Sequence, residues 1–162
     1  LALQYPARVS KLIVADIAPK VYDVNSKFSN IITGLLQLAS STLFSRAEAD
    51  VQLATYVPEM GVRQFLLKNL AWTEDRTLKL RCNIEVLQHR LQQIGAQPSG
   101  TAYEGETLFL AGENSDYILP SDMDGMLSFF PKATVTWIEN AGHWLHAENP
   151  KAFTAALHTF LD

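Results

Sequence analysis

The chain has 162 residues, of which 48% are hydrophobic and 19% are charged, and its formal net charge is −4. This length and apolar content suffice for one ordinary domain with a buried core. The mild charge and the absence of a basic stripe argue against a nucleic-acid partner, and no run approaches the roughly 18 apolar residues of a membrane span. The single cysteine, Cys82, excludes an internal disulfide and fits a reducing compartment, so we expect a cytoplasmic protein.

Three short, nearly continuous apolar runs predict strands that are buried on both faces, as in a parallel sheet. They are Lys11–Ala15, Thr107–Ala111 and Thr134–Ile138, and each leads into turn-forming residues. A short helix is expected from Asp122 to Phe130, and a last helix opens at Pro150 with its apolar residues on one face. Strands alternating with helices through short connections predict a parallel α/β architecture. In open sheets of this kind, ligands bind at the carboxyl ends of the strands.

The segment between the first and second predicted strands has a different pattern. It contains no convincing strand, and helical stretches are expected at 28–39, 46–56, 62–70 and 82–94. An all-helical insertion between two parallel strands is typical of a cap or lid. The sequence therefore predicts an α/β core from 1–19 (the end of a helix and a strand) and 104–162, interrupted by a helical cap at 20–103.

Four stretches together resemble a known family. They are LIVADIAP, GVRQFLLKNL, LFLAGENSDYI and NAGHWLHAENP, in chain order. This ordered set is similar to the C-terminal part of an α/β-hydrolase, closest to the small YbfF-like esterase branch. The resemblance implies a serine esterase or thioesterase that cleaves a small-molecule acyl ester through a Ser-Asp-His triad. It implies no cofactor and no metal site, since serine hydrolysis needs none.

The resemblance assigns His143, directly after Ala-Gly in NAGHWLHAENP, as the general base. A histidine that titrates near neutral pH can accept a serine proton and pass it to a leaving group. The acid is open between two carboxylates, because the position that the family at large uses is Ser115, which cannot carry the charge that orients the imidazole. Asp116 comes one residue later, and Asp16 ends the first predicted strand. We favour Asp16, because its DIAP stretch resembles the esterase branch.

No serine lies in a G-x-S-x-G pentapeptide, the strained strand-to-helix turn that exposes the nucleophile in this family. We therefore expect the nucleophile to lie upstream of this chain and the 162 residues alone to be inactive. The expected partner is the missing N-terminal half of the fold, or another chain that completes the sheet. Without it, the outer strand would be left unpaired.

The substrate-binding residues expected from the sequence are Trp144 as a pocket wall, and Phe28, Phe65 and Leu66 as an acyl-binding cleft under the cap. Apolar residues at helical spacing are more often ordinary core, so packing is the competing interpretation. Two alternative functions also stay open. The first is another α/β-hydrolase activity, either a haloalkane dehalogenase or a carbon–carbon bond hydrolase, and the second is a non-catalytic interaction module.

Overall fold

The computed structural model describes residues 1–162, and the chain divides into two compact units. Unit 1 comprises Leu1–Val21 and Gln97–Asp162, and unit 2 comprises Tyr22–Ala96. Unit 2 lies inside the segment 20–103 that the sequence predicts as a cap, and its role as a cap stays a prediction. No helix in the structure has both the length and the apolar character needed to cross a membrane.

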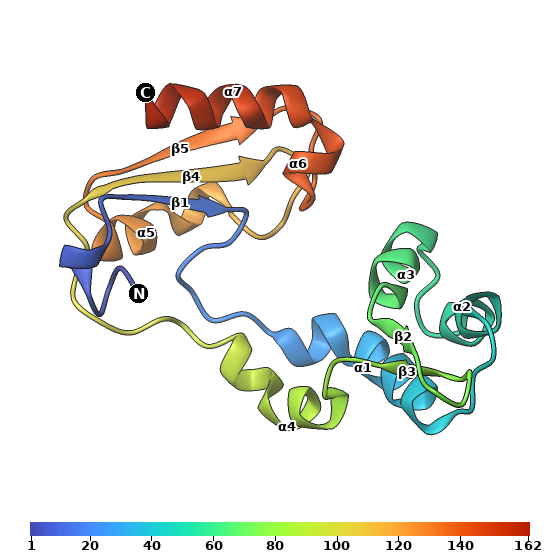
Figure 1. Cartoon of the computed structure of the whole chain (residues 1–162). Helices are drawn as coiled ribbons and strands as arrows, with labels where there is room; N and C mark the ends of the chain where they lie inside the picture. Colours follow the sequence, from blue (N-terminus) through green and yellow to red (C-terminus); the bar gives the residue numbers. More distant parts are fainter. The chain divides into compact units, whose positions relative to one another are not determined.

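Unit 1 is built on a three-stranded parallel sheet in the order β1-β4-β5 (Figure 1). The strands are β1 (Lys11–Ala15), β4 (Glu106–Gly112) and β5 (Ala133–Ile138). Strand β4 lies in the middle, and all its residues after Glu106 are buried, which explains its continuous apolar sequence. The predicted parallel α/β architecture is confirmed. Ahead of β1, the expected helix end is a single turn closed by Tyr5 N–H on the Leu1 carbonyl, followed by the 3-10 helix η1 (Pro6–Arg8).

Helices cover both faces of this sheet (Figure 1). On one face, α7 (Pro150–Leu161) places Phe153, Ala156 and Leu157 against Leu108 and Leu110 of β4. On the other face, 3-10 helix η2 (Pro120–Asp122) leads into α5 (Met123–Phe129), whose buried Met126 packs in one cluster with Phe109 and Ala111. Alternate residues of β4 therefore serve opposite layers, as the two-residue period of a strand requires.

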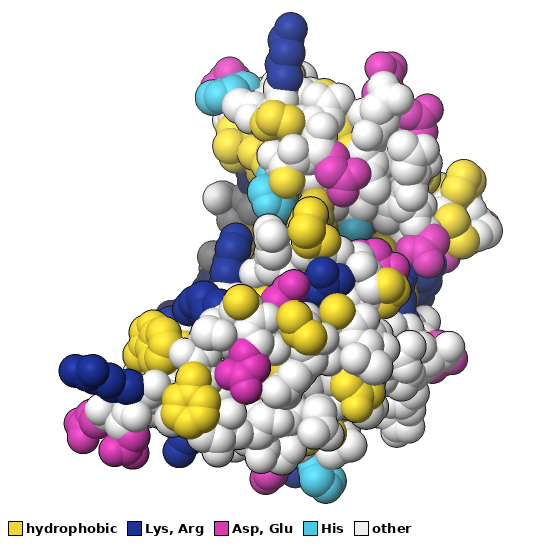
Figure 2. Space-filling model, turned by 90° about the vertical axis from the view of Figure 1, so that its right-hand side faces the viewer, with side chains coloured by type: hydrophobic (Ala, Val, Ile, Leu, Met, Phe, Trp, Pro, Cys, Tyr) yellow, Lys and Arg dark blue, Asp and Glu magenta, His cyan; other side chains and the backbone are white.

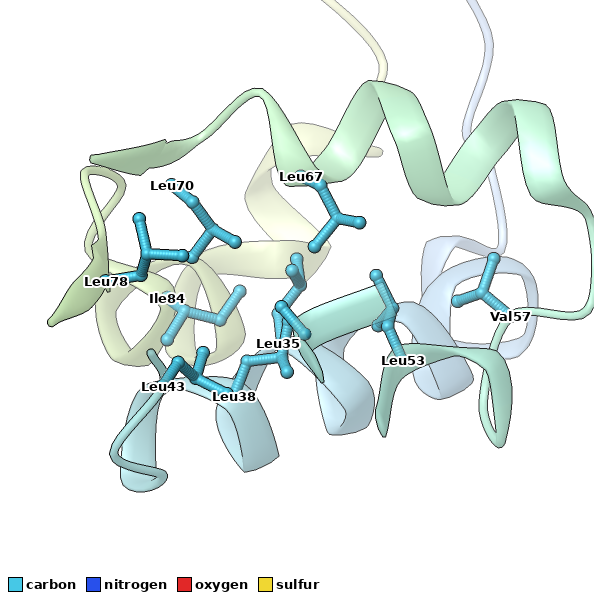
Figure 3. Packing of buried hydrophobic residues seen from close by; sticks show 10 residues of the cluster. Leu35, Leu38, Leu43, Leu53, Val57, Leu67, Leu70, Leu78 and Ile84 are labelled. Atoms are coloured by element: carbon cyan, nitrogen blue, oxygen red, sulfur yellow. The ribbon is translucent and has the colours of Figure 1, made fainter. Parts of the chain in front are cut away.

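Unit 2 contains four helices, namely α1 (Val24–Ser40), α2 (Arg46–Ala54), α3 (Met60–Leu67) and α4 (Ile84–Ile94). Asp23, Ser45 and Asn83 begin three of them, and each side chain accepts a hydrogen bond from a backbone N–H in the first turn. Such caps satisfy donors that a helix start otherwise leaves unpaired. The helices surround a core of leucines with Ile84 and Val57 (Figure 3).

The prediction of an all-helical insertion is wrong in one place, because unit 2 also holds an antiparallel pair, β2 (Leu70–Trp72) and β3 (Leu78–Leu80). The helix predicted to run to Leu70 ends instead at Leu67. The turn at Thr73–Thr77 closes the pair: the Thr73 N–H donates to the Thr77 carbonyl, and Arg76 adopts a left-handed φ of 56°. Three-residue strands are too short for their alternation to be distinguished from helical spacing in the sequence.

On the face drawn in Figure 2, Lys and Arg side chains lie among Asp and Glu side chains and among scattered apolar ones. No stripe of a single sign of charge is seen on that face.

Candidate active site

Asp16 follows directly after β1, at the carboxyl edge of the sheet, and its side chain is fully buried. Its backbone has a φ of 49°, in the left-handed region that non-glycine residues other than Asn, Asp and His adopt only rarely. Its N–H donates to the carbonyl of Leu110 at 2.7 Å, which extends the β1–β4 pairing by one bond. The chain therefore bends sharply at the point where the apolar strand ends and presents a carboxylate at the sheet edge.

The carboxylate of Asp16 accepts three hydrogen bonds. Its Oδ1 accepts from the backbone N–H of Gly112 at 3.0 Å. Its Oδ2 accepts from the Ser115 hydroxyl at 2.5 Å and lies 2.8 Å from Nδ1 of His143. A buried carboxylate is costly unless it is paired and hydrogen-bonded, and these three donors supply that compensation. The arrangement joins the ends of β1 and β4 to the loop after β5.

The ring of His143 is held on two sides. Besides the contact with Asp16, it stacks on Tyr117, with ring centroids 4.0 Å apart and planes 18° from parallel. Tyr117 is itself fixed by its backbone N–H, which donates to the Ser115 hydroxyl at 3.2 Å. The imidazole nevertheless keeps 45% of its surface exposed. It is thus oriented by neighbours and still accessible to a reactant.

The loop that carries His143 approaches the end of β4 very closely. A Cβ on Gly112 would lie 2.2 Å from the carbonyl oxygen of Gly142 and 2.6 Å from that of Ala141, so only glycine fits at this position. Asn114 N–H donates to the Ala141 carbonyl at 2.9 Å, and Asn140 turns the chain with a left-handed φ of 55°. The short Asn-Ala-Gly sequence therefore delivers His143 directly over the neighbouring strand end.

The geometry defines what this pair can do chemically. An ionised carboxylate only accepts hydrogen bonds, so Asp16 holds the imidazole with its proton on Nδ1. The other ring nitrogen, Nε2, then carries a free lone pair and can accept a proton. No group of three or more His, Cys, Asp or Glu side chains is arranged to hold a metal ion.

Two further residues that the sequence indicated are the alternative acid and the expected pocket wall. Asp116 is exposed, and the imidazole of His143 contacts Asp16 instead. Trp144 is half-buried and begins the short helix α6 (Leu145–Glu148), next to His143. Their catalytic and substrate-binding roles stay predictions.

The three apolar residues expected to line a cleft are all in unit 2. Phe28 lies on α1 and is half-buried, and Phe65 on α3 is 54% exposed. Leu66 packs against the leucine core of that unit. Leu66 thus has at least a packing role, whereas Phe65 presents an aromatic surface to solvent.

Sequence reasoning misses the roles of two residues at the site. The sequence marks Ser115 only as the place where a carboxylate is expected, and it assigns no role to Tyr117. The one sequence feature that could have indicated these roles is the position of both residues in the GENSDYI stretch. That stretch directly follows the end of a predicted strand. Ser115 bonds to a residue 99 positions away in the chain, and Tyr117 stacks on a ring carried by a different loop, so neither contact is visible in local spacing.

A buried carboxylate follows one strand of a parallel sheet and pairs with a histidine that follows another, so the molecule is an α/β protein with a His–Asp pair at the carboxyl edge of its sheet. Comparison with protein-family models gave no match. Comparison with curated proteins and with solved structures gave several matches.

The sn-1-specific diacylglycerol lipase ABHD11 of Mus musculus is 37% identical over 166 residues, which cover 99% of this chain and 54% of that protein. Esterase YbfF of Escherichia coli (strain K12) is 33% identical over 155 residues, covering 96% of this chain and 59% of the esterase. A solved marine microorganism esterase is 36% identical with a TM-score of 0.88, and the match covers 96% of this chain and 62% of that one.

These similarities extend over almost the whole chain, and the chain belongs to the α/β-hydrolase superfamily. The predicted resemblance to the YbfF esterase is confirmed by the match itself. The chain spans little more than half the length of the two curated relatives named above.

Proposed function

We propose that this chain forms part of a serine hydrolase that cleaves carboxylic esters or thioesters, with His143 as general base and Asp16 as the acid of the triad. The observation that carries the proposal is the 2.8 Å contact between His143 Nδ1 and the buried Asp16 carboxylate. The similarity to proteins named as esterases and lipases supports the same class of reaction.

The serine nucleophile comes, in this proposal, from polypeptide upstream of these 162 residues, which contain no G-x-S-x-G sequence. The same polypeptide, or another chain, pairs with the outer edge of β1 and completes the sheet. Without a nucleophile the 162 residues alone are inactive. A cytoplasmic location, expected from the single cysteine, remains part of the proposal.

The proposed reaction uses both residues of the pair. The serine oxygen attacks the acyl carbon while Nε2 of His143 takes the hydroxyl proton, and Asp16 stabilises the imidazolium that forms. Nε2 then protonates the leaving alcohol or thiol, and the C–O or C–S bond breaks to leave an acyl-serine. Water, deprotonated by the same nitrogen, releases the carboxylic acid and restores the serine.

A fluorophosphonate probe, which reacts with activated serines, tests this assignment. It should label the full-length protein, should label the His143→Ala variant far more slowly, and should leave the 162-residue chain unlabelled. Labelling of the 162 residues alone would show that a nucleophile had been overlooked. Absence of labelling in the full-length protein, together with no ester cleavage, would favour a dehalogenase with an aspartate nucleophile or a non-catalytic module.

The acyl group is selected, in the same proposal, by apolar side chains that include Phe28, Phe65, Leu66 and Trp144. A series of p-nitrophenyl esters of increasing chain length, extended to acylglycerols because the mouse relative is named a diacylglycerol lipase, measures this preference. Phe65→Ala should change the chain-length profile. Phe44→Ala is the matched control, since Phe44 is a comparably exposed aromatic residue of unit 2 outside the proposed set. Equal profiles for the two variants would remove Phe65 from the acyl site.

A further inference from the structure

Glu148, at the end of α6, folds back onto the loop that carries His143. One carboxylate oxygen, Oε2, accepts from the backbone N–H of Gly142 at 2.7 Å. The other, Oε1, accepts from the backbone N–H of Trp144 at 3.2 Å. The two oxygens of one carboxylate therefore hold the backbone N–H groups of the residues immediately before and after His143.

A second glutamate holds the same loop further upstream. Glu113, which follows β4, accepts from the backbone N–H of Asn140 through Oε2 at 2.9 Å. Alternate backbone N–H groups of the loop, at residues 140, 142 and 144, are thus each bonded to a glutamate carboxylate. Charged acceptors make stronger hydrogen bonds than neutral ones, so this pattern restrains the loop along its whole length.

The space around Gly142 shows how closely Glu148 fits. A Cβ at position 142 would lie 3.2 Å from Oε2 of Glu148, tighter than ordinary van der Waals contact. The close approach to Gly112 fixes the loop on its other side, through the carbonyl oxygens of Ala141 and Gly142. The backbone of residues 141 and 142 is therefore enclosed between the end of β4 and the Glu148 carboxylate.

Glu148 is exposed to water, which competes for the same N–H groups when the carboxylate is removed. Its contribution to the free energy of unfolding is therefore small. The Trp144 N–H belongs to the peptide group that follows His143, and the Gly142 N–H belongs to the peptide group between Ala141 and Gly142. The two bonds therefore restrain the backbone on both sides of the His143 Cα, which carries the imidazole. A displacement of about 1 Å in a catalytic group costs about 100-fold in rate.

We propose that Glu148 is a positioning residue for His143: by bonding to the N–H groups on both sides of it, the carboxylate sets the imidazole on Asp16 and at the distance that proton transfer requires. This inference rests on the proposed function where it is tested by reaction rates. Its test by NMR spectroscopy needs only the contact between His143 and Asp16. Glu148 contacts no reacting atom and acts through the backbone.

The test compares three variants of the full-length protein. Glu148→Ala removes both bonds and should lower kcat for p-nitrophenyl butyrate about 100-fold with KM nearly unchanged. Glu148→Gln keeps the shape and one acceptor oxygen, so it should lose less than the alanine variant. Glu139→Gln is the matched control, since that exposed side chain removes the same charge nearby, makes no contact with the loop N–H groups and should leave kcat unchanged.

The second readout is the low-field proton NMR signal of the Nδ1 proton that His143 shares with Asp16. It should broaden or disappear in Glu148→Ala and stay sharp in Glu139→Gln, while the Tm values of all three variants remain close to that of the wild type. The proposal is overturned if kcat and the signal survive in Glu148→Ala, or if the control loses as much. If kcat falls in Glu148→Ala and the Tm falls with it, Glu148 has a role in folding instead. If the wild type cleaves no ester, the proposed function fails, and the NMR signal still decides the role of Glu148.

Discussion

The two units of the chain differ in what they bury. Unit 2 is organised around a cluster made only of apolar side chains, among them Leu35, Leu53 and Leu78 (Figure 3). The buried polar side chains of the chain, Asp16 and Thr107, both belong to unit 1. Unit 1 thus combines its apolar layers with a charged group that depends on directional hydrogen bonds.

The two units should therefore respond differently to substitution. Apolar burial is non-directional and roughly proportional to area, so a change in the core of unit 2 alters stability. The site of unit 1 depends on the angle and length of a few hydrogen bonds around one carboxylate, so a change there should first alter how the His143 ring is held. Single substitutions in each unit test this separation, with activity measured on the full-length protein.

The largest effect is expected for Asp16→Asn. The amide keeps the shape but loses the charge that holds the proton on Nδ1, so kcat should fall about 10⁴-fold. Asp116→Asn, the matched control on the alternative acid, should change kcat only a few-fold. Ester hydrolysis under initial-rate conditions measures both, and the opposite ranking would make Asp116 the acid.

The second largest effect is expected for a substitution in the apolar core of unit 2. Leu53→Ala truncates a side chain with 0% exposure and should cost about 2–5 kcal/mol of unfolding free energy. Val51→Ala, on the same helix but 72% exposed, should stay within about 0.5 kcal/mol. Urea denaturation gives both values. The comparison breaks down if Leu53→Ala lowers kcat in the folded protein as strongly as Asp16→Asn does.

Ser115→Ala tests a single hydrogen bond at the site. The hydroxyl lies 2.5 Å from Asp16 Oδ2, and a bond to a charged group contributes about 1.5–3 kcal/mol, so the carboxylate should be less well held. Stability should fall by roughly that amount, and kcat should fall by less than in Asp16→Asn. Ser121→Ala is the control, since that serine is exposed and lies in η2 rather than beside Asp16. Identical behaviour of the two serine variants would remove Ser115 from the site.

The smallest effect separates two helical glycines of unit 2. A Cβ on Gly61 meets nothing within 4 Å, so Gly61→Ala should stabilise by about 0.5–1 kcal/mol. A Cβ on Gly34 would lie 2.7 Å from Leu53 Cδ1, so Gly34→Ala should destabilise by about 1–3 kcal/mol. Thermal melts compare them directly, and two stabilising variants would show that the core around Leu53 is loosely packed.

Much of the fold could be predicted from the sequence because its main elements carry strong local signals. The apolar run of β1 (Lys11–Ala15) matches the predicted range, and α7 begins at Pro150 as expected. These signals are the continuous apolar run of a buried strand and a proline at the first turn of a helix. The hairpin formed by β2 and β3 escapes prediction, because its stability comes from pairing and from packing of Leu70 and Leu78 in the core rather than from a local pattern.

For the site, the sequence indicated His143 and two possible acids, and it could not choose between them from spacing. Asp16 is 127 residues from His143, whereas Asp116 is much nearer in sequence. Distance along the chain does not decide which carboxylate meets the imidazole, since the carboxyl ends of neighbouring parallel strands share one edge. The hydrogen bonds of Ser115 and the stacking of Tyr117 depend on this edge as well.

Local sequence patterns are enough to predict the strands of the parallel sheet, most of the helices and the chemical types of the residues at the sheet edge, since each depends on neighbours within a few positions. The contact between Asp16 and His143, and the bonds from Glu148 to the loop around that histidine, become visible only in the folded chain. Hydrogen bonds act over about 3 Å, so these partners depend on how the strand order β1-β4-β5 brings the strand ends together.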